Sequence, residues 1–151
     1  MKDVAENTRE FSKRSNDRHT KVGAALLTMR PDGEYRVVSY GHNQIIDRGD
    51  DSSFERPKKY ERAIHAEAMA IGKAAMMGHS TDTAVLYVTH PPCLECCKLI
   101  VASGISAVIV GNGSYFSDSA EERQRAEFML RDVVVMGEDE AISRRIIGCC
   151  K

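Results

Sequence analysis

Three residues of this chain have the types and spacing of a metal site. Cys93 and Cys96 are one helical turn apart in P-P-C-L-E-C-C, and His65 lies in the earlier run H-A-E. Thiolate sulfur and histidine nitrogen are common ligands of Zn²⁺, and three protein ligands with a fourth open position are typical of catalytic zinc sites. We therefore predict that His65, Cys93 and Cys96 bind zinc. A redox pair and a structural zinc site are the alternatives for C-x-x-C.

Glu67 comes two residues after His65, which on a helix places it about 200° round the axis. That separation is unfavourable for two ligands of one ion, so we expect Glu67 to lie beside the metal as the catalytic acid and base. There its carboxylate can take a proton from the attacking water and deliver it to a leaving amine. The combination of H-x-E with P-C-x-x-C is the signature of zinc-dependent nucleobase deaminases.

The other cysteines have no predicted role in the site. Cys97 falls one step round the helix from Cys96, and we expect a packed thiol. Cys149 and Cys150 lie at the extreme C-terminus, where chains often fray. An odd, clustered set of five cysteines indicates metal ligation or free thiols better than a disulfide framework.

The elements that must hold these residues follow from hydrophobic periodicity and from turn residues. Alternating strands and helices predict an α/β fold of three layers, with a central mixed sheet of about five strands that opens with a hairpin. A long loop is expected over residues 43–60. Helices are expected at about 3–14, 63–77, 93–104, 119–131 and 138–147, and strands at 21–29, 35–42, 84–90, 107–111 and 133–136.

Length and composition limit the classes of function. The 151 residues are enough for one domain, and we predict a single zinc-dependent deaminase domain over 1–151. Lys plus Arg (21) and Asp plus Glu (22) nearly cancel, so no long nucleic acid is expected as a partner. The polar start and the lack of a long apolar run predict a cytoplasmic protein that is not bound to a membrane.

Four segments between residues 11 and 110 resemble the deoxycytidylate (dCMP) deaminases of the cytidine deaminase superfamily. They are S-K-R-S-N-D-R-H-T-K-V-G-A-A-L-L, Y-G-H-N-Q, R-P-K-K-Y-E-R-A-I-H-A-E-A-M-A-I and L-Y-V-T-H-P-P-C-L-E-C-C-K-L-I-V-A-S-G-I. The resemblance implies a cytidine-deaminase-like fold and hydrolysis of dCMP to dUMP and ammonia. It also implies a homo-oligomer, hexamer or dimer, with possible regulation by dCTP and dTTP.

The resemblance and the expected fold together indicate substrate-binding residues. His42 and Gln44 differ from the family's G-Y-N-G pattern, whereas Asn43, which contacts the sugar in the family, is kept. The other candidates precede the first strand, flank the metal ligands or follow a buried strand: Arg18, His19, Lys21, Ala66, Pro92 and Tyr115. His90 and Pro91 are further candidates for the base pocket, and Phe54 in the long loop is a candidate stacking group.

Several readings of the function remain open at this point. The same chemistry would suit a purine nucleotide, cytidine, guanine or adenosine in transfer RNA, although the balanced charge disfavours RNA. A non-catalytic zinc-binding interaction module predicts a closed fourth coordination position and tolerance of changes at Glu67. A thiol redox protein predicts that chelation of metal leaves activity intact.

Overall fold

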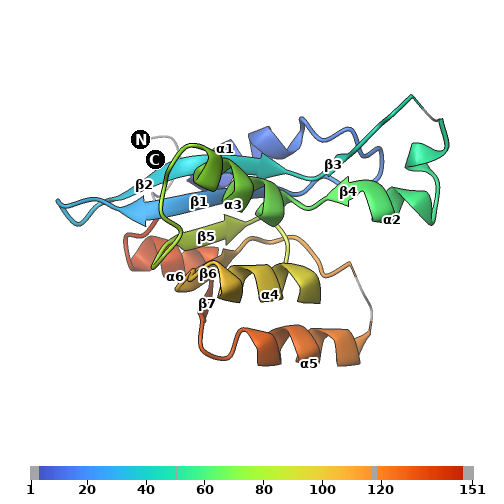
Figure 1. Ribbon diagram of the computed structural model, residues 1–151. Helices are drawn as coiled ribbons and strands as arrows, with labels where there is room; N and C mark the ends of the chain where they lie inside the picture. Colours follow the sequence, from blue (N-terminus) through green and yellow to red (C-terminus); the bar gives the residue numbers. More distant parts are fainter. Residues whose placement is uncertain (1–3, 50, 117–118, 148–151) are drawn as a thin grey trace.

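The computed structural model describes residues 4–49, 51–116 and 119–147. Its centre is a five-stranded sheet in the order β2-β1-β5-β6-β7 (Figure 1). Strand β1 (Gly23–Met29) pairs antiparallel with β2 (Tyr35–His42) and with β5 (Val85–Val88). Strands β6 (Ala107–Val110) and β7 (Val134–Gly137) continue the sheet in parallel. The predicted α/β fold with a mixed sheet of about five strands is confirmed.

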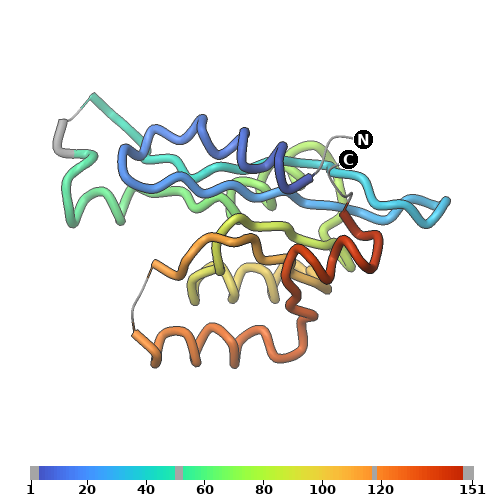
Figure 2. Tube along the Cα trace, turned by 180° about the vertical axis from the view of Figure 1, so that it is seen from behind, coloured from blue at the N-terminus to red at the C-terminus, as the bar shows by residue number. Residues whose placement is uncertain are grey.

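Helices cover both faces of the sheet, as Figures 1 and 2 show from opposite sides. Helices α3 (Ala66–Met76), α4 (Leu94–Ala102) and α5 (Ala120–Met129) lie on one face. Helices α1 (Val4–Ser12) and α6 (Glu138–Ser143) lie on the other.

The strands supply both cores because side chains alternate across a sheet. Leu26 and Leu86 belong to the core under α3 and α4. Their neighbours Leu27 and Tyr87 belong to the core under α1 and α6. Such strands, buried on both faces, read as continuous apolar runs, which is why the sequence predicted them well.

The segment predicted as a loop over 43–60 contains regular structure, so that expectation was wrong. It holds β3 (Gln44–Ile45), the 3-10 turn Asp51–Phe54 and the start of α2 (Lys58–Arg62). Strand β3 pairs antiparallel with β4 (Ala63–Ile64). Pairing between two-residue strands depends on tertiary contacts and leaves no periodic signal in the sequence.

Two predicted helices begin or end elsewhere. The helix expected from residue 63 starts at Ala66, because 63–64 form β4 and His65 becomes the residue that precedes the helix. The last helix ends at Ser143, and Arg145 follows with a left-handed φ of 58°. Cys149 and Cys150 lie outside the described residues.

Close packing between β2 and α3 fixes the helix that follows His65. A Cβ built on Gly41 would lie 2.1 Å from the backbone oxygen of Ala66 and 2.6 Å from the nitrogen of Ala70. Backbone atoms cannot move aside as a flexible side chain would. The glycine therefore permits the approach that holds the start of α3 against the sheet.

We expect Gly41→Ala to destabilise the protein by about 3 kcal/mol or more, because the methyl group would overlap this backbone. The matched control is Gly72→Ala in the middle of α3, where an added Cβ meets nothing within 4 Å. That change should stabilise by about 0.5–1 kcal/mol through helix propensity. Urea unfolding of both variants checks the opposite signs, and an unchanged Gly41→Ala midpoint would contradict the packing argument.

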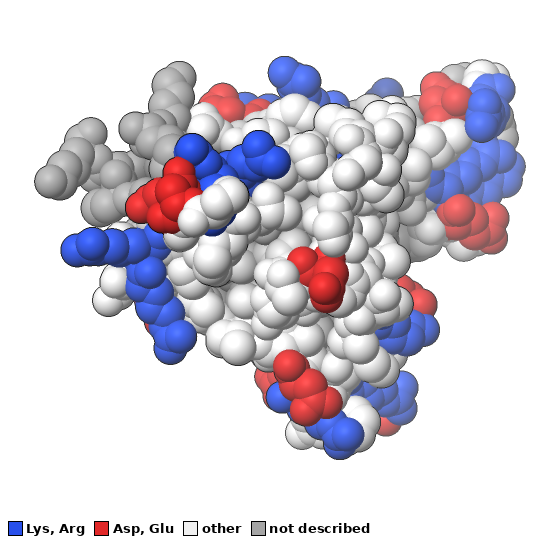
Figure 3. Space-filling view, turned by 60° about the vertical axis from the view of Figure 1, so that its left-hand side comes forward, with Lys and Arg blue, Asp and Glu red and all other residues white. Residues whose placement is uncertain are grey.

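The surface agrees with the balanced composition. On the face drawn in Figure 3, basic and acidic side chains alternate round a largely uncharged centre, and no continuous basic track crosses it. Within the described ranges, no helix combines the length and the apolar character needed to span a bilayer.

Candidate active site

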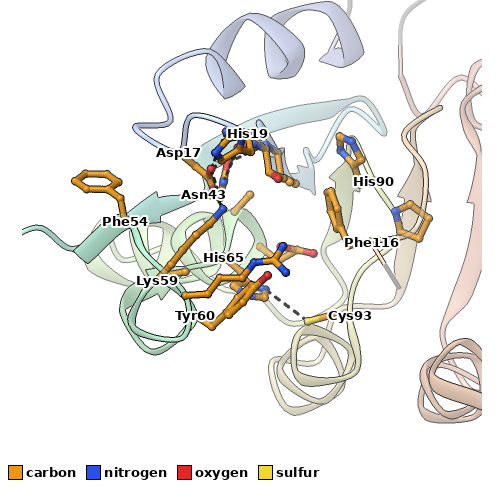
Figure 4. A pocket seen from close by; sticks show the side chains of 17 residues that line it. Asp17, His19, Asn43, Phe54, Lys59, Tyr60, His65, His90, Cys93 and Phe116 are labelled. Carbon is orange, nitrogen blue, oxygen red and sulfur yellow. Dashed lines mark hydrogen bonds and ion pairs between the residues drawn. The ribbon is translucent and has the colours of Figure 1, made fainter. Parts of the chain in front are cut away.

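A cavity of about 530 Å³ opens at the edge of the sheet where β5 and β6 end and β1 begins (Figure 4). Ligands of open α/β sheets bind at the carboxyl ends of parallel strands, and this cavity has that position. Its wall comes from five segments far apart in the sequence. One of these is the segment 17–22 before β1, and the others include Asn43 after β2, His65 before α3, His90 after β5 and Phe116 after β6.

His65, Cys93 and Cys96 meet at one side of this cavity. Two helix starts bring them together, since His65 precedes α3 and Cys93 precedes α4. The Nδ1 atom of His65 lies 3.5 Å from Cys93 Sγ and 3.3 Å from Cys96 Sγ. All three potential ligand atoms lie within 4.8 Å of one another.

The distances fit a tetrahedral zinc ion. Bond lengths of about 2.05 Å to nitrogen and 2.3 Å to sulfur give an N···S edge of about 3.6 Å in a tetrahedron. The observed separations of 3.5 and 3.3 Å are close to this value. His65 and Cys93 line the cavity and Cys96 is buried, so a metal held by these three groups would be reached from the cavity. An open fourth position is the arrangement of catalytic zinc sites.

The three proposed ligands change one another's pKa values. A hydrogen bond from the Cys96 thiol lowers the pKa of Cys93 to about 4, and burial opposes this effect. The same contact, together with burial, raises the pKa of Cys96. The hydrogen bond with Cys93 raises the pKa of His65. A divalent cation at this point would displace those protons, as metal binding to Cys and His generally does.

Glu67 lies next to this cluster in the first turn of α3. It is only 4% exposed, and it lines the cavity beside His65. Burial raises the pKa of its carboxyl group, which the positive side chain of His65 partly offsets. A carboxyl group with a raised pKa keeps its proton more readily, which suits a group that must donate a proton as well as accept one.

Two hydrogen bonds fix the side chain of Asn43, which lies in the cavity wall next to the segment that precedes β1. Its side-chain Oδ1 accepts from the backbone nitrogen of Val22 at 2.8 Å, and its Nδ2 donates to the oxygen of Thr20 at 2.9 Å. A buried ion pair between Asp17 and Lys59 lies in the same wall, with Nζ 2.8 Å from Oδ2. These contacts fix the segment that precedes β1.

His90 and Phe116 form an aromatic wall. Their rings stack with centroids 4.9 Å apart, and Figure 4 shows them across the cavity from His19 and Asn43. The His90 ring also bonds to Thr89, with Nδ1 2.9 Å from Oγ1. Gly113 lies so close that a Cβ there would be 2.3 Å from the ring. Burial lowers the pKa of His90, which favours the neutral imidazole.

The structure brings some predicted residues to the cavity and leaves others aside. His19, Asn43, Ala66 and Glu67 line it, and so do Phe54 and Pro91. Four candidates are not among its lining residues: Arg18, Lys21, Pro92 and Tyr115. Arg18 lies over the Phe54 ring, Lys21 donates to the Ser15 carbonyl and Tyr115 faces Arg123. Cys97 is fully buried, which confirms the packed thiol.

Sequence reasoning missed several lining residues. Those with polar or aromatic side chains are Asp17, Thr20, Arg56, Lys59, Tyr60 and Phe116. The segment R-P-K-K-Y immediately precedes β4 and the expected ligand His65, and that adjacency was the available signal for Arg56, Lys59 and Tyr60. Phe116 is the neighbour of the predicted Tyr115.

Comparison with known proteins identifies a family for most of the chain. Residues 2–112 match the family described as "Cytidine and deoxycytidylate deaminase zinc-binding region". A probable deoxycytidylate deaminase of Drosophila melanogaster is 33% identical over 138 residues, with 82% of this chain and 63% of the relative covered. The human deoxycytidylate deaminase is 30% identical over 132 residues, with 81% and 70% covered. The chain thus spans about two thirds of these relatives' length.

Solved structures give the same answer for the fold. The dCMP deaminase of cyanophage S-TIM5, crystallised with dCMP and dUMP, superposes with a TM-score of 0.66 at 25% identity. The alignment covers 88% of this chain and 92% of the phage protein.

Proposed function

The chain belongs to the cytidine and deoxycytidylate deaminase family, and from this premise we propose that it hydrolyses dCMP to dUMP and ammonia. The observation that carries the proposal is the cluster of His65, Cys93 and Cys96, which opens on a cavity beside the buried Glu67. A binding module would need neither the open side nor a buried carboxyl group next to it.

We propose that His65, Cys93 and Cys96 hold a zinc ion. The donor set of one imidazole and two thiols suits this metal, and the distances between the ligand atoms support it. When bound, zinc supplies Lewis acidity that makes a hydroxide nucleophile available at neutral pH.

Glu67 moves the protons in this proposal. Hydrolytic deamination requires one proton to leave the attacking water and another to reach the departing amine. Two observations support Glu67 in both transfers: it is buried, and it lines the cavity together with the proposed ligand His65. Its raised pKa supports the protonated state that the second transfer needs.

Substrate recognition is assigned to the remaining walls. We propose that Asn43 contacts the sugar, and that Ala66, Pro91, His90 and Phe116 surround the base. The phosphate needs one or two donors, and His19 and Arg56 are cationic or polar groups of the wall. Among the described residues, Arg56 has an aromatic contact with Tyr60 and no carboxylate partner, so its charge is free for an anion.

The experiment is ammonia release measured across dCMP, CMP, deoxycytidine, dCTP, AMP and dAMP, with zinc content determined on the same sample. Turnover that is fastest with dCMP at about one zinc per chain supports the proposal. Faster turnover of another compound would keep the chemistry and replace the substrate. Bound zinc without ammonia from any of them would lead to polynucleotide substrates and then to a metal-held interaction module.

Three properties of the whole protein are also proposals. We propose that residues 1–151 work as one zinc-dependent deaminase domain and that copies associate into a homo-oligomer. Exposed Met76 and Met77 at the end of α3 are compatible with such an interface.

The free thiols of Cys93, Cys96 and Cys97 suit a reducing compartment such as the cytoplasm. Regulation by dCTP and dTTP remains a prediction.

A further inference from the structure

We propose that Lys59 is a positioning residue, whose ion pair with Asp17 holds α2 against the segment that orients Asn43 and so sets the affinity for substrate. The inference rests on the proposed function, because it concerns the wall of the same cavity. Neither residue of the pair contacts the ligand cluster, so the effect is on the shape of the pocket and not on the metal.

The pair is well formed and largely shielded from solvent, with Asp17 buried and Lys59 partly buried. The Lys59 Nζ atom lies 2.8 Å from Asp17 Oδ2 and 3.0 Å from Oδ1, so it bridges the carboxylate. The side chains are only 13% and 6% exposed. Burial opposes ionisation of Asp17, but the hydrogen bonds and charge of Lys59 and two backbone N–H groups keep its pKa below the usual value. Asp17 is therefore charged at neutral pH.

From Asp17 a chain of hydrogen bonds reaches Asn43. The Oδ1 atom of Asp17 accepts from the backbone nitrogens of His19 at 2.9 Å and Thr20 at 3.3 Å, which shapes the turn before β1. The oxygen of Thr20 then accepts from Asn43 Nδ2 at 2.9 Å. Movement of Asp17 would therefore displace the acceptor that fixes the Asn43 side chain.

On its other side the pair is attached to the segment of backbone that precedes His65. Lys59 lies in α2, which runs into β4 and then into His65. Strand β4 pairs with β3, and Asn16 bonds to both backbone groups of Ile45 in β3. The ion pair thus closes a ring of contacts on one side of the cavity, and Asn43 and His65 both adjoin this ring; Figure 4 shows Asp17 and Lys59 on the side away from His90 and Phe116.

Stability alone does not account for a buried charged pair at this place. The loss of hydration of two ions often exceeds their attraction, and apolar residues of similar size can be equally stabilising. An ion pair does give a fixed direction and separation, which suits a wall whose polar groups must meet a ligand. The ion pair also neutralises the Lys59 ammonium group, so this charge does not attract anions unselectively.

The test compares Lys59→Met, Asp17→Asn, the double variant and Lys59→Arg in zinc-loaded full-length protein. Asparagine at position 17 keeps an oxygen that can accept from the nitrogens of His19 and Thr20. Each single change leaves one buried charge unpaired and should lower the melting temperature, whereas the double variant leaves none and should recover much of it. The matched control is Lys13→Met, which removes an exposed pair with Glu10.

We expect the double variant to keep kcat and to raise KM for dCMP by about tenfold or more. The reason is that the melting temperature recovers, but the contact that holds α2 against the segment before β1 does not. Lys59→Arg should restore a KM close to that of the unmodified protein. If KM recovered together with the melting temperature in the double variant, the pair would be merely structural and the inference would be overturned.

A second readout does not depend on turnover. The side-chain amide resonance of Asn43 in the zinc-loaded protein should shift or broaden in the double variant and stay in place in Lys13→Met. An unchanged Asn43 resonance in the double variant would refute the positioning role even if KM rose. Absence of ammonia release from the unmodified, zinc-loaded protein would instead refute the proposed function, and this resonance would still decide the inference.

Discussion

Replacement of Glu67 by glutamine is expected to reduce turnover by about 10²- to 10⁴-fold while zinc stays bound. Glutamine has nearly the same shape and can fill the same buried position in α3. It cannot take a proton from the attacking water, and it has no carboxylic proton to give to the amine. Because Glu67 is not among the groups proposed to hold the metal, its loss should remove proton transfer and leave the ligand cluster intact.

The measurement is ammonia release from dCMP at saturating concentration, with zinc counted by elemental analysis of the same sample. Glu95→Gln is the matched control, since Glu95 is an exposed residue of α4 that pairs with Lys98. We expect it to keep full turnover. Near-normal turnover of Glu67→Gln would exclude Glu67 from proton transfer.

Replacement of Cys93 by alanine is expected to abolish zinc binding, lowering the content from about one ion per chain to near zero after dialysis. The hydrogen bond from Cys96 lowers the pKa of Cys93 to about 4, so the metal-free protein presents this residue as a thiolate, the form that binds metal. Two ligands, His65 and Cys96, would remain. The melting temperature should fall as well, because a bound metal stabilises only the folded state.

Cys97→Ala is the matched control for Cys93→Ala, because it removes a buried thiol that is not a proposed ligand. Cys97 is fully buried next to Cys96, and its sulfur contacts the Pro92 carbonyl at 3.7 Å. Its removal should cost about 1 kcal/mol of stability and leave the zinc content unchanged. A Cys93→Ala protein that still carried one zinc per chain would contradict the assigned ligand set.

The sequence predicted the fold and the ligand cluster because both depend on local signals. Buried strands such as β5 appear as continuous apolar runs, and C-x-x-C at a helix start already places two sulfurs on one face. The meeting of His65 with this pair followed from the rule that consecutive helices of such a sheet begin at the same edge. No local signal of this kind exists for β3 and β4, whose pairing joins residues about twenty positions apart.

The walls of the cavity were harder to predict for the same reason. Lys59 and Asp17 are 42 positions apart, and an isolated lysine in a charged segment is usually a solvated surface residue. Tyr115 was the predicted substrate-binding residue after β6, but its neighbour Phe116 lines the cavity. Adjacent residues in extended chain point in opposite directions, so a shift of one residue changes which side chain faces the substrate.

The contact between Gly113 and His90 bears on how this family can vary. The imidazole ring fills the space that any larger residue at position 113 would need, and Thr89 and Phe116 hold the ring from two other directions. The side chains at positions 90 and 113 therefore compete for the same space. In related chains that keep this loop, a side chain at position 113 requires a smaller residue at position 90, so the two sites should covary in size while Cys93, three positions after His90, stays constant.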